Sequence, residues 1–252
     1  MQIYDKPTKI LMREFAAELS TGQQFSRKDA VAWFGAHYPR IKPGTVTAHC
    51  EGMSVNSENR KHHPSIKPGS GHDLFWKIAP GRFRVWDEDT DPKPIYPKFD
   101  GGEEAEHGNG GEETDTDDGE AGTEFAAERD LQQYLAKNLE ILEPGLKLYE
   151  EEEINGIEYP AGGRYIDILA VDKDDNYVVI ELKVSRGYDR VIGQLLRYMG
   201  WIERNLSDGK PVRGWIVARN ITDDLKLATS RVHGVDLYEY EINFSVSKVS
   251  SD

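Results

Sequence analysis

Two carboxylates and a lysine stand where a buried strand would not ordinarily keep charge. Residues 177–184, Tyr-Val-Val-Ile-Glu-Leu-Lys-Val, are apolar nearly throughout, which is typical of a central strand covered on both faces. Glu181 and Lys183 share one face of this strand because side chains alternate with period two. Asp167 interrupts the preceding strand, residues 163–171, between two isoleucines. Buried charges are costly unless they pair or bind a cation, so these three residues are candidates for a site.

The pairing of the two strands decides what chemistry the three residues can do. If the strands pair through a turn at residues 172–176, Asp167 lies beside Glu181. Two adjacent carboxylates repel each other, and a divalent cation relieves that repulsion. Ligands that are all oxygen suit Mg²⁺ or Mn²⁺ better than zinc. Lys183 would then position a water activated by the metal. The alternative is a structural ion-pair cluster without metal.

Helices on either side of these strands contribute further polar residues. A predicted helix over residues 125–143 has a leucine stripe that continues back to Glu128. An acid on the buried side of a helix needs a partner or a site, although the first turn of a helix also favours acids. A second predicted helix, residues 188–205, places Gln194 and Tyr198 on one face. The predicted element order of this half is α-β-β-β-α-β-α-β.

At this point the residues resemble the PD-(D/E)XK, or restriction-endonuclease-like, nucleases. More narrowly, the runs Glu-Arg-Asp-Leu-Gln-Gln-Tyr-Leu, Gly-Arg-Tyr-Ile-Asp-Ile-Leu, Val-Ile-Glu-Leu-Lys and Gln-Leu-Leu-Arg-Tyr-Met are similar to the nuclease domain of NucS/EndoMS. The resemblance covers residues 125–240 and implies an α/β fold, a mixed sheet flanked by helices. The N-terminal half differs from the β-rich domain of that group, so mismatch recognition does not follow from it.

The resemblance also implies roles for individual residues. Asp167 and Glu181 would hold the metal, with the Leu182 carbonyl as a further ligand. Lys183 would orient the water or stabilise the charge of the phosphate. The remaining catalytic candidates are an additional acid and two residues that shape the site, namely Glu128, Gln194 and Tyr198.

Charge and composition divide the chain into three parts. The total net charge is −14, but residues 1–96 carry +3, residues 97–122 carry −9 and residues 123–252 carry −8. The acidic, glycine-rich middle part has no large apolar residue from Asp100 to Gly122, and we expect an extended linker there, with mimicry of DNA as the alternative. A single cysteine, Cys50, excludes an internal disulfide. No apolar run is long enough to span a membrane and no signal segment is evident, so we expect a cytoplasmic protein.

The first part is predicted to be a small α+β winged-helix-like domain. Helical spacing in residues 7–20, a cap at Ser26 and Pro43 at a helix start predict three helices, and residues 73–79 and 82–86 predict a hairpin. This order resembles the winged-helix-like modules fused to restriction-type nucleases. The third helix would then enter the major groove, unless the module serves protein contacts. The candidate DNA contacts of the whole chain are Arg40, Lys42, Thr45, Thr47, Arg60, Lys61, Lys67, Lys77, Arg82, Arg84, Arg164 and Arg197.

The sequence therefore predicts a metal-dependent DNA endonuclease that acts in repair or restriction on mismatched, damaged or modified duplex. Two alternatives stay open, namely a DNA-binding regulator that has lost catalysis and a nuclease for RNA or for branched or single-stranded DNA. Cutting both strands of a duplex with one such domain would need two copies, so a homodimer is a further expectation.

Overall fold

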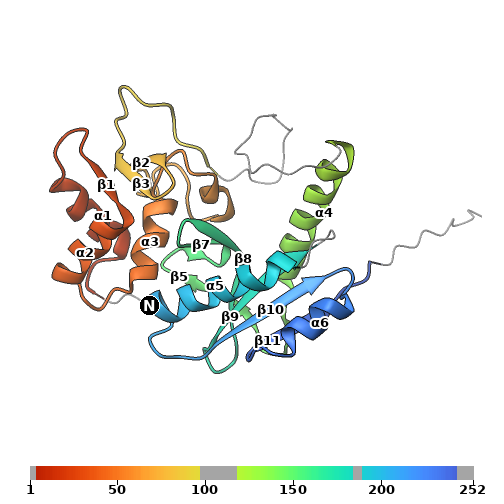
Figure 1. Ribbon diagram of the computed structural model, residues 1–252. Coiled ribbons are helices and arrows are strands. Elements are labelled where there is room, and N and C mark those ends of the chain that lie inside the picture. Colours follow the sequence, from red (N-terminus) through yellow and green to blue (C-terminus); the bar gives the residue numbers. More distant parts are fainter. Residues whose placement is uncertain (1–3, 97–117, 184–188, 243–252) are drawn as a thin grey trace, which may run out of the picture.

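The computed structural model describes residues 4–96, 118–183 and 189–242 of the chain, and for residues 118–127 and 189 it describes the backbone only. Two domains lie side by side, the first built mainly of helices and the second around a larger sheet (Figure 1). No helix in the described part of the chain is long and apolar enough to cross a membrane.

The first domain combines three helices with a small antiparallel sheet. Its sheet has the strand order β1-β3-β2. Its elements are α1 (Thr8–Ala17), β1 (Gln24–Ser26), α2 (Arg27–His37), α3 (Pro43–Gly52), the 3-10 helix η1 (Glu58–His62), β2 (Phe75–Ala79) and β3 (Arg82–Val85). The three predicted helices and the hairpin are present, whereas the sequence pattern gave no sign of β1 or η1.

Local signals explain where these elements begin. Ser26 caps α2 in a capping box, because its side chain accepts from the Asp29 N–H and the Asp29 carboxylate accepts from the Ser26 N–H. Pro43 opens α3, as its fixed backbone angle favours. Gly81 turns the hairpin with a φ of 72°, which a residue with a side chain rarely adopts. The predicted cap at Ser26, the predicted helix start at Pro43 and the predicted hairpin are confirmed.

The second domain is a mixed sheet between two helices. Its elements are α4 (Asp118–Lys137), the 3-10 helix η2 (Leu139–Ile141), β4 (Lys147–Leu148), β5 (Glu150–Glu151), β6 (Ile154–Asn155), β7 (Ile157–Ala161), β8 (Arg164–Val171), β9 (Tyr177–Lys183), α5 (Asp189–Asn205), β10 (Val212–Ala218), α6 (Asp223–Thr229) and β11 (Val235–Glu239). The strand order is β11-β10-β9-β8-β4, with β7 also paired to β8. Strands β9, β10 and β11 are parallel, and β8 is antiparallel to its neighbours.

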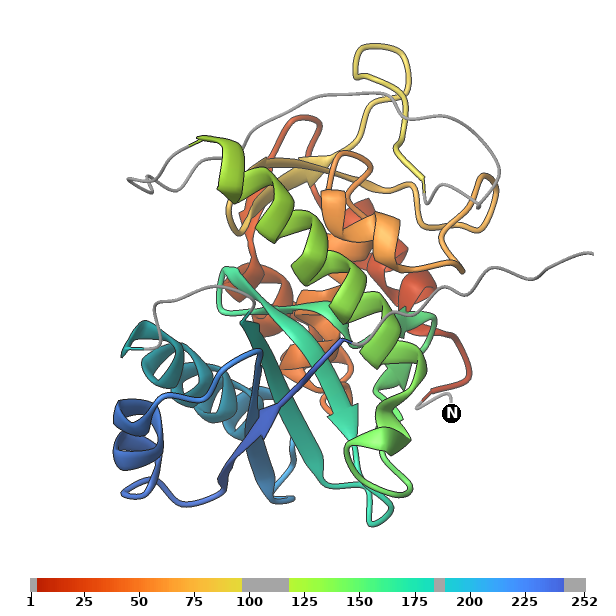
Figure 2. The same ribbon diagram turned by 90° about the vertical axis from the view of Figure 1, so that its right-hand side faces the viewer.

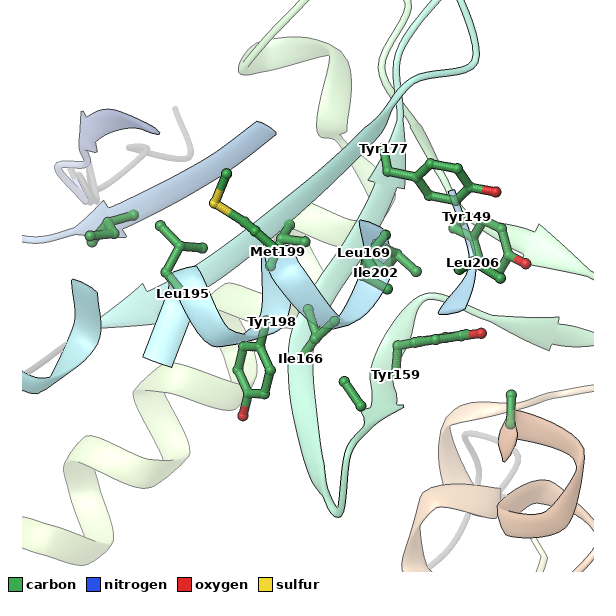
Figure 3. Packing of buried hydrophobic residues seen from close by; sticks show 14 of the residues in the cluster. Tyr149, Tyr159, Ile166, Leu169, Tyr177, Leu195, Tyr198, Met199, Ile202 and Leu206 are labelled. Carbon is green, nitrogen blue, oxygen red and sulfur yellow. The ribbon is translucent and has the colours of Figure 1, made fainter. Parts of the chain in front are cut away.

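The two faces of this sheet carry separate cores. On one face, α5 packs its apolar side on β9 and β10; Leu195 and Ile202 belong to this cluster together with Val179. Figure 3 shows these α5 side chains over the sheet, with Tyr198 beside Ile166 of β8. On the other face, α4 lies across the strands and buries its leucine stripe (Figure 2). Strand β9 is covered on both sides, as its apolar run predicted.

Three boundaries differ from prediction. Helix α4 begins at Asp118, inside the expected linker of residues 97–122, and ends at Lys137 rather than near residue 143. The remainder of that linker, residues 97–117, lies outside the described residues. Residues 146–153, for which we expect one strand, hold the two short strands β4 and β5, and β5 ends at Glu151 because Glu152 and Glu153, both with positive φ angles, turn the chain into β6. Strand β7 was not predicted.

Helix α3 lies against the second domain (Figure 1). Small residues at Gly44, Ala48 and Gly52 recur every four positions and therefore share one face of the helix. A Cβ placed on Gly44 would lie 3.0 Å from Leu206 Cδ1, and one on Gly52 would lie 2.7 Å from Ile154 Cδ1. Ala48 belongs to the core of the second domain. This stripe allows the helix to approach closely, and it fixes the two domains together.

The prediction that the third helix reads the major groove is therefore wrong for this arrangement. Thr45 and Thr47, the side chains expected to contact DNA from α3, are buried. Thr45 Oγ1 donates to Glu151 Oε2 of the second domain at 2.6 Å, and Thr47 Oγ1 donates to the Pro43 carbonyl at 2.9 Å. The face that would meet DNA is covered by the second domain of the same chain.

Candidate active site

Strands β7, β8 and β9 bring three carboxylates abreast. Strands β7 and β8 are antiparallel with Ile157 opposite Ile168, so that Glu158 stands opposite Asp167. On the other side of β8, the pairs with β9 run from Val171 as far as Ile168, which lies opposite Ile180, and the next position in register sets Asp167 opposite Glu181. The predicted neighbourhood of Asp167 and Glu181 is therefore present.

Asp167 lies where the regular pairing of β8 with β9 ends. Its Oδ2 accepts the backbone N–H of Leu182 at 2.7 Å, in place of a strand-to-strand hydrogen bond. The pKa of Asp167 is raised to about 7, because burial and the nearby Glu158 outweigh the opposite effects of the Leu182 N–H and the charge of Lys183. The carboxyl group is thus held where its negative charge is poorly compensated by the protein itself.

Glu181 is buried more completely than Asp167. Gln194 donates from Nε2 to Glu181 Oε1 at 2.5 Å, and Lys183 Nζ lies 3.5 Å from the same oxygen. The second oxygen, Oε2, is buried and has no hydrogen-bond partner among the described residues. Burial, followed by the charge of Asp167, raises the pKa of Glu181 well above its ordinary value. An unpartnered buried carboxylate oxygen is the kind of atom that a cation would satisfy.

The helices complete the site from both faces. Lys183 Nζ lies 3.7 Å from Glu128 Oε1 of α4. Burial lowers the pKa of Lys183, but the charges of Glu181, Asp167 and Glu128 outweigh burial and raise it. On α5, Gln194 Nε2 lies 3.4 Å from the Tyr198 hydroxyl. Burial, and then the charge of Glu181, raises the pKa of Tyr198 to about 12. All six predicted catalytic residues thus lie in one site.

Two polar residues of this site were missed by the sequence interpretation. Gln132 of α4 is buried and donates from Nε2 to Glu158 Oε1 at 2.8 Å and to the Asp167 carbonyl at 2.9 Å. Its position four residues after Glu128, on the same helix face, was an available signal. No such signal marks Glu158, because Pro160 disfavours a strand in the interior of a sheet in that segment.

The donor set fits a cation that prefers oxygen. Within the described ranges, no group of three or more histidine, cysteine, aspartate or glutamate side chains forms a cluster suited to a metal ion. A cation would therefore rely on Asp167 and Glu181 together with a main-chain oxygen such as the Leu182 carbonyl. The unpartnered Oε2 of Glu181 is the observation that favours this set.

The predicted DNA contacts fall into three groups. Four bases have carboxylate partners within the first domain, namely Arg60 with Asp73, Lys61 with Glu58, Lys77 with Glu51 and Arg84 with Asp91. Arg60 has no exposed surface, so its prediction as a phosphate contact is wrong. The exposed candidates are Arg40, Lys61, Lys67, Arg82, Arg164 and Arg197, and Lys42 is half-buried beneath the ring of Tyr177.

Two turns meet at the boundary between the domains near the start of β8. A Cβ placed on Gly81, in the β2–β3 turn, would lie 3.0 Å from Arg27 Nη1, and one on Gly163, in the β7–β8 turn, would lie 3.5 Å from it. A cavity of about 530 Å³ opens beside this point, and its lining includes Gly162 and Trp201. Exposed arginines follow both turns, at positions 82 and 164.

Comparison with known proteins separates the two halves of the chain. Residues 127–241 match the family of the endonuclease NucS C-terminal domain, and residues 7–85 match a family described as a domain of unknown function (DUF7669). The endonuclease NucS of Bifidobacterium animalis subsp. lactis is 37% identical over 112 residues, which are 44% of this chain and 44% of that protein. The endonuclease NucS of Pyrococcus abyssi is 32% identical over 102 residues, 40% and 37% of the two chains.

Two solved structures are similar to a part of the chain. A repair endonuclease from Pyrococcus abyssi is 25% identical and covers 52% of this chain and 50% of its own, with a TM-score of 0.38. An EndoMS complex with double-stranded DNA is 27% identical and covers 55% and 51%, with a TM-score of 0.37. The chain spans less than half the length of the curated relatives named above. From its family match and the site that it carries, the segment of residues 127–241 is a NucS-like nuclease C-terminal domain.

Proposed function

We propose that the chain is a divalent-metal-dependent endonuclease that hydrolyses phosphodiester bonds of DNA, in repair or restriction. The observation that carries this proposal is that Asp167, Glu181 and Lys183 lie together and that Oε2 of Glu181 is buried with no hydrogen-bond partner among the described residues. DNA as the substrate is supported by the relatives of the second domain, which are endonucleases by name.

The proposed cofactor is Mg²⁺ or Mn²⁺, held by Asp167, Glu181 and the Leu182 carbonyl. A bound cation of this kind polarises the phosphate and lowers the pKa of its water. Gln194 would hold the Glu181 carboxylate in orientation through its hydrogen bond to Oε1. The two carboxylates would attract a cation strongly, because charges interact more strongly away from bulk water.

Lys183 is proposed to act on the water or on the phosphate. Its pKa is raised, so the side chain stays a cation at neutral pH. With its ammonium group 3.5 Å from Glu181 and 3.7 Å from Glu128, the lysine is held at the edge of the carboxylate pair. A fixed positive charge there would stabilise the charge that develops on the phosphoryl oxygens.

The first domain is proposed to be a winged helix. The order α1-β1-α2-α3-β2-β3, with strands arranged β1-β3-β2, supports that interpretation. Because α3 is covered, contact with DNA would come from the hairpin side. Arg82 after the β2–β3 turn and Arg164 after the β7–β8 turn are the exposed bases nearest to the domain boundary. Phosphate contacts by such side chains give affinity without sequence preference.

The substrate is proposed to be duplex DNA with a mismatched, damaged or modified base. RNA and branched or single-stranded DNA are alternative substrates, and a regulator that binds without cutting is the remaining alternative. The experiment is digestion of a panel of these nucleic acids with Mg²⁺ or Mn²⁺, with and without EDTA. We expect metal-dependent cutting of one duplex class. If no member of the panel is cut at any metal concentration, the nuclease proposal fails.

Substitutions connect that activity to the site. Asp167→Ala and Glu181→Ala should each abolish cleavage while DNA binding is retained, because neither carboxylate is needed to hold the phosphate backbone. The matched control is Asp174→Ala, an exposed aspartate in the β8–β9 turn, which should cut like the parent. Near-parental cutting by either site variant would remove that carboxylate from the proposed metal ligands. Sedimentation in the presence of DNA tests the homodimer.

A further inference from the structure

Strand β7 carries an acid in an unfavourable backbone conformation directly opposite Asp167. Glu158 has a φ of 48°, in the left-handed region, and it is the non-glycine residue with positive φ that lies within a strand of the described chain. An L-residue in this region costs conformational energy that the surrounding contacts must offset. The contacts that hold Glu158 therefore show what the conformation achieves.

Glu158 is held from both sides. Its backbone carbonyl accepts a hydrogen bond of 2.6 Å from Nδ2 of Asn59, which belongs to η1 of the first domain. Its side-chain Oε1 accepts 2.8 Å from Gln132 Nε2. The same Gln132 nitrogen donates 2.9 Å to the backbone carbonyl of Asp167. A continuous chain of hydrogen bonds thus runs from the first domain to the backbone of a proposed metal ligand.

Asn59, at which this series of hydrogen bonds reaches the first domain, is itself held in place by a hydrogen bond. His63 Nε2 lies 3.0 Å from Asn59 Oδ1, and His63 Nδ1 accepts the N–H of Asn155 at 3.2 Å. The imidazole is therefore neutral, with its proton on Nε2, and burial lowers its pKa to about 3. Asn155 Nδ2 also donates to the His62 carbonyl at 2.7 Å. Residues 59–63 thus bind the second domain at β6, the strand that precedes the one with Glu158.

We propose that the first domain is a working part of the nuclease site, in which Asn59, Glu158 and Gln132 are positioning residues that hold the backbone of Asp167 against Glu181. This inference rests on the proposed function, because it assigns these residues to the support of a metal-binding pair. None of the three is required to touch DNA. Their effect is on how closely the two carboxylates converge on a cation, which such supporting hydrogen bonds commonly govern.

The test measures binding of Mn²⁺ alone, by titration calorimetry of the full chain without DNA. Asn59→Ala, Gln132→Ala and Glu158→Ala should each weaken Mn²⁺ binding by about 10- to 100-fold. Glu158→Gln keeps an oxygen that can accept from Gln132, so its Mn²⁺ affinity should stay within about threefold of the parent. Equal losses in Glu158→Gln and Glu158→Ala would overturn the positioning role, since the charge of Glu158 would then be what matters.

Kinetics and a matched control separate positioning from general stability. Asn56→Ala removes two hydrogen bonds to the backbone of Lys77 within the first domain, and it should leave Mn²⁺ affinity unchanged. In cleavage assays the positioning variants should lower kcat at fixed Mn²⁺ and leave KM for DNA unchanged. If Asn59→Ala fails to fold, Asn59→Asp, which lacks the amide donor at the same size, takes its place. Parental Mn²⁺ affinity in a folded Asn59 variant would overturn the inference.

Loss of the proposed function is distinguishable from loss of this inference. Asp167→Asn should itself weaken Mn²⁺ binding at least as strongly as any positioning variant. If Asp167→Asn binds Mn²⁺ like the parent, the metal site is wrongly placed and the proposed function fails. If Asp167→Asn loses Mn²⁺ while the Asn59, Gln132 and Glu158 variants retain it, only the positioning role fails.

Discussion

Replacing Glu51 by glutamine should weaken the whole chain, because Glu51 is a buried charge shared by both domains. Glu51 has no exposed surface, and its carboxylate pairs with Arg27 and, at 2.9 Å, with Lys77 Nζ. Tyr165 of β8, in the second domain, donates to it at 3.3 Å. Burial opposes the ionisation of Glu51, but Lys77 and Arg27 outweigh burial and hold its pKa below the ordinary value.

The size of the loss follows from the two cations left behind. Removing one member of a buried ion pair costs about 3–5 kcal/mol, because the remaining charge stays without compensation. The side chains of Arg27 and Lys77 are 17% and 21% exposed, so water reaches both and the lower end of that range applies. A loss of about 3 kcal/mol, with a urea dependence of roughly 2–3 kcal/mol/M, lowers the unfolding midpoint by roughly 1–1.5 M.

The assay is urea unfolding of the full chain followed by tryptophan fluorescence and far-UV circular dichroism. Tryptophans lie in both domains, for example Trp33 in α2 and Trp215 in β10. Coincident transitions of the two signals would indicate one cooperative unit. The matched control is Glu58→Gln, which removes an exposed partner of Lys61 and should cost less than about 1 kcal/mol.

A loss of under about 1 kcal/mol in Glu51→Gln would refute this reasoning, since the two cations would then be stable without the carboxylate. Unchanged stability of the second domain, with the first domain alone weakened, would refute the part that concerns Tyr165. In that case the contact from Tyr165 would not couple the two unfolding reactions.

Three further outcomes are expected. Lys183→Ala should cut at least about 100-fold more slowly yet still bind Mn²⁺ in calorimetry. Gly156→Ala should lower the free energy of unfolding, measured in urea, by about 1–3 kcal/mol, because its Cβ would lie 2.0 Å from the Leu169 carbonyl oxygen. Because burial lowers the pKa of His63 to about 3, its neutral form stabilises the fold fully above pH 6.5, and about 2 kcal/mol is lost by pH 5. His63→Gln should flatten that pH dependence.

The convergence of the proposed catalytic residues could be predicted because each stands at a fixed offset in a regular element. Glu181 and Lys183 share a face of β9 by the alternation of a strand, and Gln194 and Tyr198 share a face of α5 by the helical repeat. Asp167 was visible as a charge within an apolar strand. In each case local geometry alone decides the direction of the side chain.

Glu158 and Asn59 could not be predicted in this way. Glu158 is placed by the register between β7 and β8 and by a left-handed backbone angle, and neither is encoded in a short-range pattern. Asn59 meets it from a position 99 residues earlier in the chain. Tertiary contacts of this separation depend on how the domains pack.

Charge alone also failed to separate binding side chains from structural ones. Basic residues that resemble a DNA-binding set in the sequence serve as partners of acids in the folded chain, as with Arg60 and Asp73. The stripe of Gly44, Ala48 and Gly52 on α3 was an available signal for close helix packing. Because this stripe carries no charge, the distribution of charge along the chain does not reveal it.

The position of the first domain limits how DNA can approach the carboxylates. A duplex lying on α3 would require the domain boundary to open, with the loss of the contacts that α3 makes across it, among them those of Glu51 with Tyr165 and of Thr45 with Glu151. A duplex lying on the hairpin side meets Arg82 and Arg164 without any opening. From Arg164, strand β8 reaches Asp167 in three residues, about 10 Å at the rise of a strand. A phosphate held by Arg164 would thus lie within a few nucleotides of the proposed site, so we expect DNA to approach the acids from the side away from α3.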